Sequence, residues 1–520
     1  MNKPVWIAGI ARGHNAGVCL LKDGEVIFAI EEERLTRQKY DGAPYAAIVK
    51  ILEYTDKLDY LIVAHTQSLQ SSAGKIDFSG DDPYTGLARK LGLIQRGHNS
   101  YAESHPQVID LSHIHHKLHA ACAFYRSGFD SAVALVVDGA GTFLDFRINN
   151  EVMTCWETES IFDCEYPETF KTFYKHVGVR GPMIGNKIIE FSSEMFDEPA
   201  DATHILHISE NAGITKAYEA VTEYCGFQFI EAGKTMGLFP YGKENSKCPK
   251  IFRDDTIYPI ADRQVIIPDY PNGAHVNYNM FTELAKGDVT RDEQIDITEY
   301  QNRRDFAYSI QTQTQDEVVK LIKESVKLSG KKKVVISGGY GLNCVANYHY
   351  LEALKDEDIE IYVEPVSNDA GTAMGAALLW HRKLTGDTTV NPQVETLYEG
   401  PEYNYSVDQI HEVAKKYNAD VKTATIDDAV TLLTDRKIVT LFQGRSENGP
   451  RALGNRSIIA DPRKSDMQKI LNLKIKYREG FRPFAPVGGT ICAASPTKNK
   501  LFQFNYSTSG GNSASRLSIS

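Results

Sequence analysis

The chain has 520 residues, of which 42% are hydrophobic and 24% are charged, and its formal net charge is −11. A chain of this length exceeds what one hydrophobic core organises, so two or more domains are expected. The negative charge argues against a surface that coats nucleic acid, although it allows a local basic pocket. With no signal-type segment and no membrane-length apolar run, the sequence predicts a cytoplasmic protein without a membrane partner. The eight cysteines are scattered without a C-x-x-C pair, which is typical of free thiols.

Short apolar segments at the start of the chain predict strands over Val5–Ile10, Gly17–Leu21 and Glu25–Ile30. Residues 22–24, Lys-Asp-Gly, predict a tight hairpin turn between the second and third of them. The loop between the first two strands carries small residues around His14. A strand, a functional loop and a second strand are how the actin-like and sugar-kinase ATPase fold begins.

Later segments alternate strands with helices. Strands are expected over Tyr60–Ala64, Ala132–Val137, Lys333–Ser337 and Glu360–Val363, and helices over Ser112–Tyr125, Phe306–Leu328 and Thr372–Leu384. This alternation predicts α/β architecture with substantial parallel sheet. Thr385–Tyr403 is rich in Gly, Pro, Asp and Asn and predicts a linker, after which a second α/β unit begins with a helix near Ser406–Tyr417. No structure is predicted for the Ser- and Asn-rich stretch from residue 495 onward.

Four histidines between positions 113 and 119 form the most informative feature. In a helix, His115 and His119 lie one turn apart on the same face, whereas His116 points elsewhere. Asp138 follows an expected strand, and Asp369 follows another strand at the start of a helix, where it suits either an N-cap or a metal ligand. Two imidazoles with two carboxylates suit a borderline metal such as iron or zinc. The alternative is a chance cluster of surface histidines.

Two further segments have binding chemistry. Residues 337–343, Ser-Gly-Gly-Tyr-Gly-Leu-Asn, follow a strand and open a helix, so their amides suit phosphate, a plain tight turn being the alternative. Between Arg445 and Arg482, ten Lys or Arg residues stand against four Asp or Glu residues. Arginines on a Gly- and Pro-rich loop suit bidentate binding of phosphate or carboxylate, the alternative being a solvated basic face.

Together these motifs resemble the O-carbamoyltransferases of the nodulation-factor, cephamycin and tobramycin type, the NodU/CmcH family. The matching segments run in family order and are Gly13–Gly17, Glu31–Arg34, His115–Ala121, Val137–Gly139, Met236–Leu238, Ser337–Cys344, Asn368–Gly371, Gly449–Asp461 and Arg478–Pro486. The resemblance implies an actin-like transfer domain over residues 1–384, similar to the tRNA threonylcarbamoyl-transfer ATPases. It further implies a linker over 385–403 and a smaller YrdC-like α/β domain over 404–520.

The resemblance also implies an activity. The YrdC-like domain would convert carbamoyl phosphate and ATP into carbamoyl adenylate, and the N-terminal domain would pass the carbamoyl group to an acceptor hydroxyl. The acceptor expected is a sugar, a natural product or another small metabolite, with a hydroxymethylated nucleobase or nucleotide as a minority alternative. The cofactors implied are ATP, a divalent metal that is usually iron (Fe²⁺), and Mg²⁺ accompanying ATP. Nucleic acid is not an expected partner, and a homodimer is a candidate assembly.

Residue by residue, the resemblance implies four sets of roles. His14 would be the general base, for which a neutral imidazole is suited. The metal ligands would be His115, His119, Asp138 and Asp369. Nucleotide would be held in the first domain by Gly338, Gly339 and Asn343. Carbamoyl phosphate and ATP would be held in the second domain by Arg445, Arg451, Asn455, Arg456, Ser457, Arg478 and Arg482.

One departure from the family concerns the C-terminal part of the chain. Family members continue with a His-Val-Asp-Gly-Thr-Ala-Arg segment and an Asn-Thr-Ser-Phe-Asn segment, and neither occurs in this sequence. The sequence therefore predicts that the YrdC-like domain is incomplete after about residue 487, which puts the adenylation half-reaction in question. Two alternative functions follow, a relative that transfers threonylcarbamoyl to tRNA and a non-catalytic remnant that binds ATP and metal.

Overall fold

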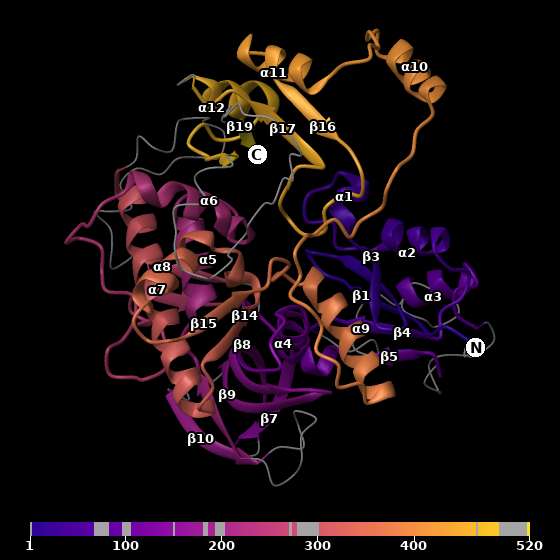
Figure 1. Ribbon diagram of the computed structural model, residues 1–520. Helices are drawn as coiled ribbons and strands as arrows, with labels where there is room; N and C mark the ends of the chain where they lie inside the picture. The colour runs from indigo at the N-terminus through magenta and orange to yellow at the C-terminus, as the bar shows by residue number, and fades with distance from the viewer. Residues whose placement is uncertain are drawn as a thin grey trace. The chain divides into compact units, whose positions relative to one another are not determined.

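The computed structural model describes residues 3–66, 83–95, 106–148, 151–179, 186–192, 203–269, 273–277, 301–463, 466–487 and 517–519. The chain divides into two compact units, Met1–Glu395 and Thr396–Ser520 (Figure 1). The Ser- and Asn-rich stretch from residue 495 lies outside the described residues, apart from 517–519. No helix in the described part of the chain is long and apolar enough to cross a membrane.

The first sheet of unit 1 is built by the N-terminal part of the chain. Its strands, in the order β3-β2-β1-β4-β5, are β1 (Trp6–Ala11), β2 (Gly17–Lys22), β3 (Glu25–Glu31), β4 (Tyr60–Ala64) and β5 (Val108–Asp110). Asp23 and Gly24 both have positive φ, 51° and 87°, as the two central residues of a type I′ hairpin turn require. The predicted hairpin between β2 and β3 is therefore present.

Both faces of this sheet are buried. Ala8, Ile10 and Val18 pack with α2 (Tyr45–Lys50) and α3 (Pro83–Lys90). The alternate residues, such as Ile7 and Cys19, face the opposite way and join the central core of unit 1. This alternation follows from the two-residue period of a strand. The short helix α1 (Glu32–Thr36) follows β3 directly.

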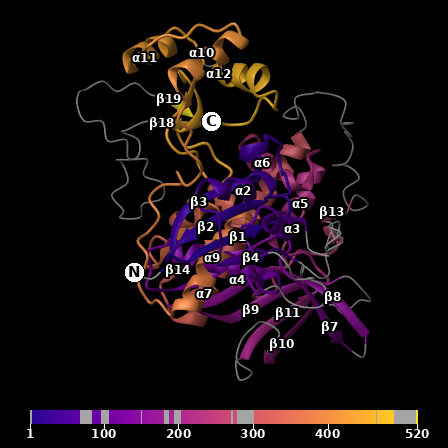
Figure 2. The ribbon, with the colours of Figure 1, turned by 90° about the vertical axis from the view of Figure 1, so that its right-hand side faces the viewer.

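The second sheet of unit 1 is larger. Its main path is β10-β11-β9-β8-β6-β14-β15, and β7 pairs with β8. Figure 2 shows the end of the sheet that contains β7 to β11. The bounds are β6 (Ser131–Val137), β7 (Phe143–Ile148), β8 (Glu151–Glu165), β9 (Thr169–Val179), β10 (Asn186–Ser192), β11 (Thr203–Ser209), β14 (Lys333–Ser337) and β15 (Glu360–Val363). A small separate hairpin pairs β12 (Ile266–Pro268) with β13 (Ala274–Val276).

The two sheets repeat one topology. The orders β3-β2-β1-β4-β5 and β9-β8-β6-β14-β15 correspond strand by strand. In each, the first strand in the chain is antiparallel to the second and parallel to the fourth, and the fourth is parallel to the fifth. A helix follows the fifth strand in both halves, α4 (His115–Arg126) after β5 and α9 (Ala370–Thr385) after β15. This duplication is the architecture expected of an actin-like unit, and the predicted α/β fold class is confirmed.

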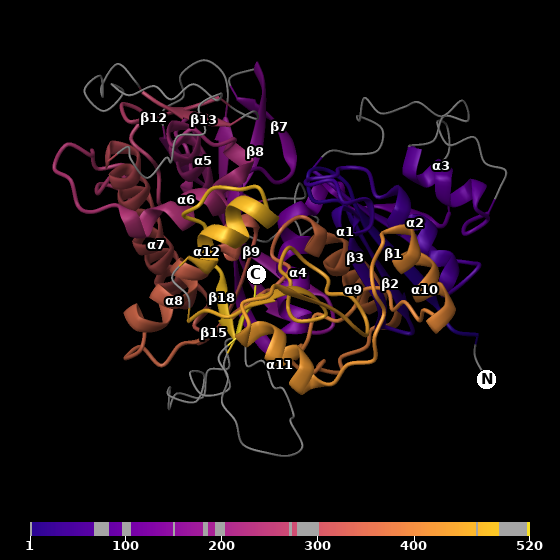
Figure 3. The same cartoon turned by 90° about the horizontal axis from the view of Figure 1, so that it is seen from above.

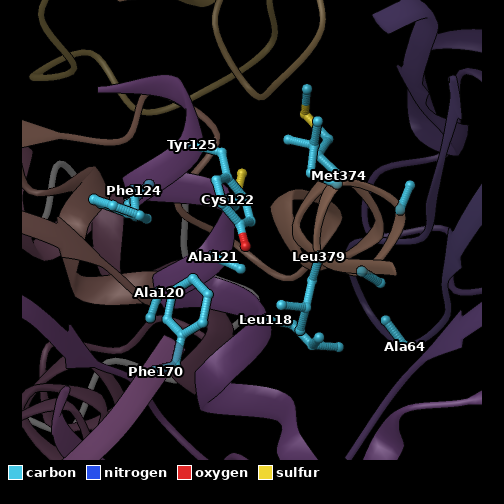
Figure 4. Packing of buried hydrophobic residues seen from close by; sticks show 14 of the residues in the cluster. Ala64, Leu118, Ala120, Ala121, Cys122, Phe124, Tyr125, Phe170, Met374 and Leu379 are labelled. Carbon is cyan, nitrogen blue, oxygen red and sulfur yellow. The ribbon is translucent and has the colours of Figure 1, made fainter. Parts of the chain in front are cut away.

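Helices α4 and α9 pack against each other between the two sheets (Figure 4). Leu118, Cys122 and Tyr125 of α4 and Met374 of α9 belong to the same buried cluster. The approach is close because α9 carries glycine where it meets α4. A Cβ atom at Gly375 would lie 1.9 Å from the carbonyl oxygen of Leu118.

The other face of the second sheet is covered by helices (Figure 3). Helices α5 (Ile214–Tyr224) and α7 (Gln301–Ser329) pack on its strands, and α6 (Ala232–Leu238) and α8 (Cys344–Ala353) pack on those helices. Ala132, Ala134 and Val136 of β6 belong to the core around α4, and α7 also packs on β6. Unit 1 is therefore layered, with α4 and α9 between the two sheets and further helices on the outer faces.

Unit 2 is a small α/β unit. It contains α10 (Val407–Lys416), α11 (Ile426–Thr434), α12 (Met467–Ile470) and a sheet of β16 (Val439–Phe442), β17 (Arg456–Ala460), β19 (Leu517–Ile519) and β18 (Ala485–Val487), in that order. A capping box at Ser406 and Gln409 begins α10, and another at Thr425 and Asp428 begins α11. Each box satisfies amide groups that the first helical turn leaves free.

Candidate metal and anion sites

Four side chains meet where α4 and α9 begin. His115 and His119 lie on α4, Asp138 follows β6, and Asp369 precedes α9. Each offers one ligand atom, and these atoms all lie within 4.8 Å of one another. The Nε2 atoms of His115 and His119 are both 3.7 Å from Asp369 Oδ1, and His115 Nε2 is 3.9 Å from Asp138 Oδ2. The structure thus brings the four predicted ligands into one cluster.

The repeated topology explains this convergence. Asp138 lies after the first strand of the second sheet, and His14 lies after the first strand of the first sheet. His115 begins the helix after the fifth strand of one sheet, and Asp369 immediately precedes the corresponding helix of the other. Loops at the carboxyl ends of parallel strands gather at one edge of an open α/β sheet, which is where such folds bind ligands.

Asp369 occupies the N-cap position of α9, but its side chain accepts no capping hydrogen bond. Its two oxygens instead face imidazoles, with Oδ2 lying 3.8 Å from His14 Nδ1. The N-cap alternative considered for this residue is therefore not realised by its side chain. The carboxylate is left available for a ligand.

The donor set fits a divalent metal. His115 and His119 are 1% and 0% exposed, and their Nε2 atoms have no hydrogen-bond partner. Buried polar atoms without partners are costly, and coordination of a metal would satisfy these two. The second shell is also present, because Gly339 N donates to Asp138 Oδ1 at 2.8 Å and Ser337 Oγ lies 3.4 Å from His119 Nδ1.

The charges within the cluster support one another. Burial would lower the pKa of His115, but the negative charge of Asp369, whose Oδ1 lies 3.7 Å from His115 Nε2, outweighs it and raises that pKa. Burial would raise the pKa of Asp369, but the charge of His14 and the adjacent His115 imidazole hold it well below its usual range. The cluster therefore keeps its carboxylates ionised, which is the form that binds a metal.

His14 lies at the open side of this cluster. Its side chain is 52% exposed and 3.8 Å from Asp369, so a molecule from solvent can reach it. The loop that carries His14 is held by His65, whose Nδ1 donates to the carbonyl oxygen of Arg12 at 3.1 Å. Burial, aided by the charge of Arg12, lowers the pKa of His65 to about 4, so this ring is neutral. Sequence reasoning missed this role of His65, because nothing local links β4 to the His14 loop.

The glycine-rich turn after β14 lies beside Asp138. Gly338 has a φ of 90°, and a Cβ there would lie 2.3 Å from the carbonyl oxygen of Val137. Asn343, by contrast, is the N-cap of α8, where its Oδ1 accepts from Ala346 N at 3.1 Å. The Asn343 amide also exchanges hydrogen bonds with the side chain of Gln311. Gly338 and Gly339 thus lie at the cluster, whereas Asn343 acts on α8.

The seven candidate residues of unit 2 divide into two groups. Four of them make hydrogen bonds to backbone groups of unit 2. Arg445 donates to the carbonyl oxygens of Glu399 and Gly400, and Asn455 donates to that of Arg445. Arg456 donates to the carbonyl oxygens of Gln443 and Gly444, and Ser457 Oγ accepts from Gly454 N. Sequence reasoning missed Glu447, which is fully buried. Its Oε1 accepts hydrogen bonds from three backbone amides of the following loop, those of Leu453, Asn455 and Arg456.

The other three candidates, Arg451, Arg478 and Arg482, are joined by Lys476, which was not predicted, in a set of four cations here called the cation cluster. Burial, together with the charges of Arg478 and Arg482, lowers the pKa of Lys476 to about 8. Burial and neighbouring arginines also lower the pKa of Arg478 to about 10. Arg478 is fixed by a 2.7 Å hydrogen bond from its Nε to Asn472 Oδ1. A group of cations whose charges lower one another's pKa favours a bound anion.

Comparison with known proteins matches each of the two parts of the chain to a family profile. The sequence profile of the carbamoyltransferase N-terminus matches residues 102–378, and that of the carbamoyltransferase C-terminus matches residues 430–504. The second match extends to residue 504, beyond about residue 487, after which the sequence predicts that the YrdC-like domain is incomplete.

Individual relatives agree with these profiles. The uncharacterized protein sll1178 of Synechocystis sp. is 29% identical over 91% of this chain and 74% of its own length. Nodulation protein NolNO of Sinorhizobium fredii is 27% identical over 91% of this chain, which spans 62% of that protein. The 3'-hydroxymethylcephem-O-carbamoyltransferase of Streptomyces clavuligerus is 36% identical over 29% of this chain and 27% of its own. A solved structure of full-length HypF covers 75% of this chain and 57% of its own, with 14% identity and a TM-score of 0.38.

Proposed function

Because the chain belongs to the carbamoyltransferase family, we propose that it is an ATP-dependent O-carbamoyltransferase. The family is one of transferases, and the proposal adds ATP, carbamoyl phosphate and a hydroxyl acceptor. The observation that carries it is the convergence of His115, His119, Asp138 and Asp369 within 4.8 Å, next to a solvent-accessible histidine.

In the first half-reaction, unit 2 would form carbamoyl adenylate. Carbamoyl phosphate is hydrolysed to carbamate and phosphate, and a carbamate oxygen then attacks the α-phosphorus of ATP and expels pyrophosphate. Arg451, Arg478 and Arg482 would bind the phosphates, with Lys476 added to the set by its place in the cation cluster. Asn455, Arg456 and Ser457 would act by shaping the loop that carries Arg451, since their hydrogen bonds go to residues 443–454. Arg445 would tie this loop to Glu399 and Gly400.

In the second half-reaction, unit 1 would transfer the carbamoyl group. His14 removes the proton from the acceptor hydroxyl, whose oxygen attacks the carbamoyl carbon, and AMP leaves with the electron pair of the broken C–O bond. A divalent metal held by the four ligands, which we propose to be Fe²⁺, would supply Lewis-acid stabilisation of phosphate charge. Gly338 and Gly339 would line the phosphate site beside Asp138, while the amide of Gly339 donates to Asp138 Oδ1.

The acceptor is proposed to be a small hydroxyl-bearing molecule. The test supplies the purified chain with ¹⁴C-carbamoyl phosphate, MgATP, Fe²⁺ and a panel of sugars, polyhydroxylated natural products and hydroxymethylated nucleosides. A parallel reaction contains tRNA and threonine in place of the panel. The proposal expects label in a carbamate ester of one class, lost in His14→Ala. Label in threonylcarbamoyl-modified tRNA, or ATP binding without any product, would contradict it in favour of one of the two alternatives.

The cation cluster gives the ATP-binding step a pH dependence. In the free protein Lys476 loses its proton as the pH rises through about 8, whereas a bound anion favours the protonated form. ATP affinity should therefore fall as the pH is raised from 7 to 9, by up to about tenfold for a unit of pKa shift on binding. In Lys476→Met this slope should disappear and the affinity at pH 7 should be lower. The same slope in wild type and Lys476→Met, measured by equilibrium dialysis, would remove Lys476 from the site.

A further inference from the structure

A buried ion pair lies behind the metal-ligand cluster. Lys175 of β9 and Glu157 of β8 form it with side chains only 4% and 1% exposed. Two charges removed from water cost desolvation free energy, and apolar residues of similar volume often serve a fold equally well. Stability alone therefore does not explain why the pair is buried. Its other hydrogen bonds connect it to the helix that carries the metal ligands.

The first connection runs from Glu157 to a metal ligand. Glu157 Oε2 accepts from Thr142 N at 2.9 Å, and Thr142 Oγ1 accepts from His115 N at 2.9 Å while donating to Ser112 O. Burial alone would raise the pKa of Glu157, but the charge of Lys175 dominates and lowers it to about 2. Glu157 is therefore ionised, and it accepts the Thr142 hydrogen bond as a carboxylate.

The hydroxyl of Thr142 does for α4 what an N-cap side chain does for other helices. Helix α4 begins at His115, and the preceding Ile114 has no side chain that can cap it. Thr142, from the loop between β6 and β7, accepts the amide hydrogen bond instead. Because His115 is the first residue of the helix, this hydrogen bond from its amide to Thr142 helps to fix the position of the His115 backbone.

A second connection reaches the next residue of the helix. Lys175 Nζ lies 3.5 Å from Ser160 Oγ, which is 2.8 Å from Nδ1 of the fully buried His116. Both side chains also pack closely on Gly141, where an added Cβ would lie 2.5 Å from His116 Cδ2 and 2.7 Å from Glu157 Oε2. The same ion pair thus restrains both His115 and His116.

We propose that the Glu157–Lys175 pair, acting through Thr142, is a positioning device that holds His115 in the orientation required for metal binding. The inference rests on the proposed function, because it assumes that His115 binds a metal. Glu157, Lys175 and Thr142 are positioning residues, because none of them belongs to the ligand set and Thr142 acts on the site through the amide of His115.

The test is a titration with Co²⁺, followed by its visible absorption, and with Fe²⁺ under anaerobic conditions. Thr142→Val keeps the shape of the side chain and removes the hydroxyl, and we expect its metal dissociation constant to rise by about 10- to 100-fold. Thr142→Ser keeps the hydroxyl and should bind within about threefold of wild type. The matched control is Thr222→Val, because Thr222 is equally buried and hydrogen-bonds Tyr218 and Thr235 on the far side of the sheet.

A second variant tests the ion pair itself. Glu157→Gln combined with Lys175→Met removes both charges together, so neither remains buried without its partner. We expect the same loss of affinity and an altered Co²⁺ spectrum, whereas a purely structural pair would change only the melting temperature of the metal-free protein. Wild-type affinity in both Thr142→Val and the double variant would overturn this proposal alone. Absence of metal binding by the wild-type chain would overturn the metal site, and this proposal with it.

Discussion

Gly375→Ala should destabilise unit 1 by about 3 kcal/mol, because overpacking at a rigid contact typically costs 1–3 kcal/mol and this contact is with backbone. The added Cβ would lie 1.9 Å from the carbonyl oxygen of Leu118, so α4 and α9 must separate. Better helix propensity would return only about 1 kcal/mol of that cost. Chemical denaturation followed by circular dichroism measures the effect.

The same substitution should weaken metal binding, since α4 carries His115 and His119 whereas Asp369 adjoins α9. Gly233→Ala is the matched control, because Gly233 also lies in a helix and a Cβ there meets nothing within 4 Å. The control should be as stable as wild type or up to about 1 kcal/mol more stable. Equal stability of Gly375→Ala and wild type would mean that the two helices do not meet as closely as described.

His119→Ala and Asp138→Ala should each remove most bound metal without unfolding unit 1. Loss of a second-shell partner alone lowers metal affinity by about 10- to 100-fold, and loss of a direct ligand should exceed that. Asp138→Asn tests the same point with little change in shape, because it replaces an ionised oxygen donor with a neutral amide. Metal content of the purified variants, measured by elemental analysis, gives the result.

The control for the histidine is His113→Ala, which changes an exposed imidazole two residues before the start of the ligand-bearing face. It should retain wild-type metal content. Wild-type content in His119→Ala or Asp138→Asn would contradict the ligand assignment, whatever metal is bound.

Local sequence patterns predicted the elements that are either apolar throughout or strongly periodic. The expected strands Tyr60–Ala64, Lys333–Ser337 and Glu360–Val363 coincide with β4, β14 and β15. The four-residue spacing of His115 and His119 predicted their common helix face, and both reach the cluster. In each case the signal lies within one element, so no tertiary information was needed.

The strands β7 to β11 were not predicted, and their composition explains why. Strands β8 and β9 bury Glu157, Glu159, Lys175 and His176. These residues pair with each other across the sheet, Lys175 with Glu157 and His176 with Glu159. Because buried ion pairs replace apolar side chains at inward positions, the alternation that identifies a strand is lost. The Thr142 network was missed for the same reason.

The meeting of Asp138 and Asp369 lay beyond local patterns, because it depends on two sheets with the same topology. Residue types allowed Asp369 to be grouped with the histidines as a candidate ligand, but the sequence alone left it between a cap and a ligand. The basic segment of unit 2 shows a different limit. Charge counting found it, but the guanidinium groups of Arg445 and Arg456 donate to backbone carbonyl oxygens, which composition does not reveal.

The most direct test of the proposed carbamoyltransferase activity is pyrophosphate release by the purified chain supplied with MgATP, Fe²⁺ and carbamoyl phosphate. The proposal predicts release that requires carbamoyl phosphate, is abolished in Arg451→Ala and is unchanged in Arg436→Ala, a control at an exposed arginine of unit 2 outside the cation cluster. Release should persist in His119→Ala, because that substitution affects the transfer site. No release by the wild-type chain, or release that is independent of carbamoyl phosphate, would contradict the proposal.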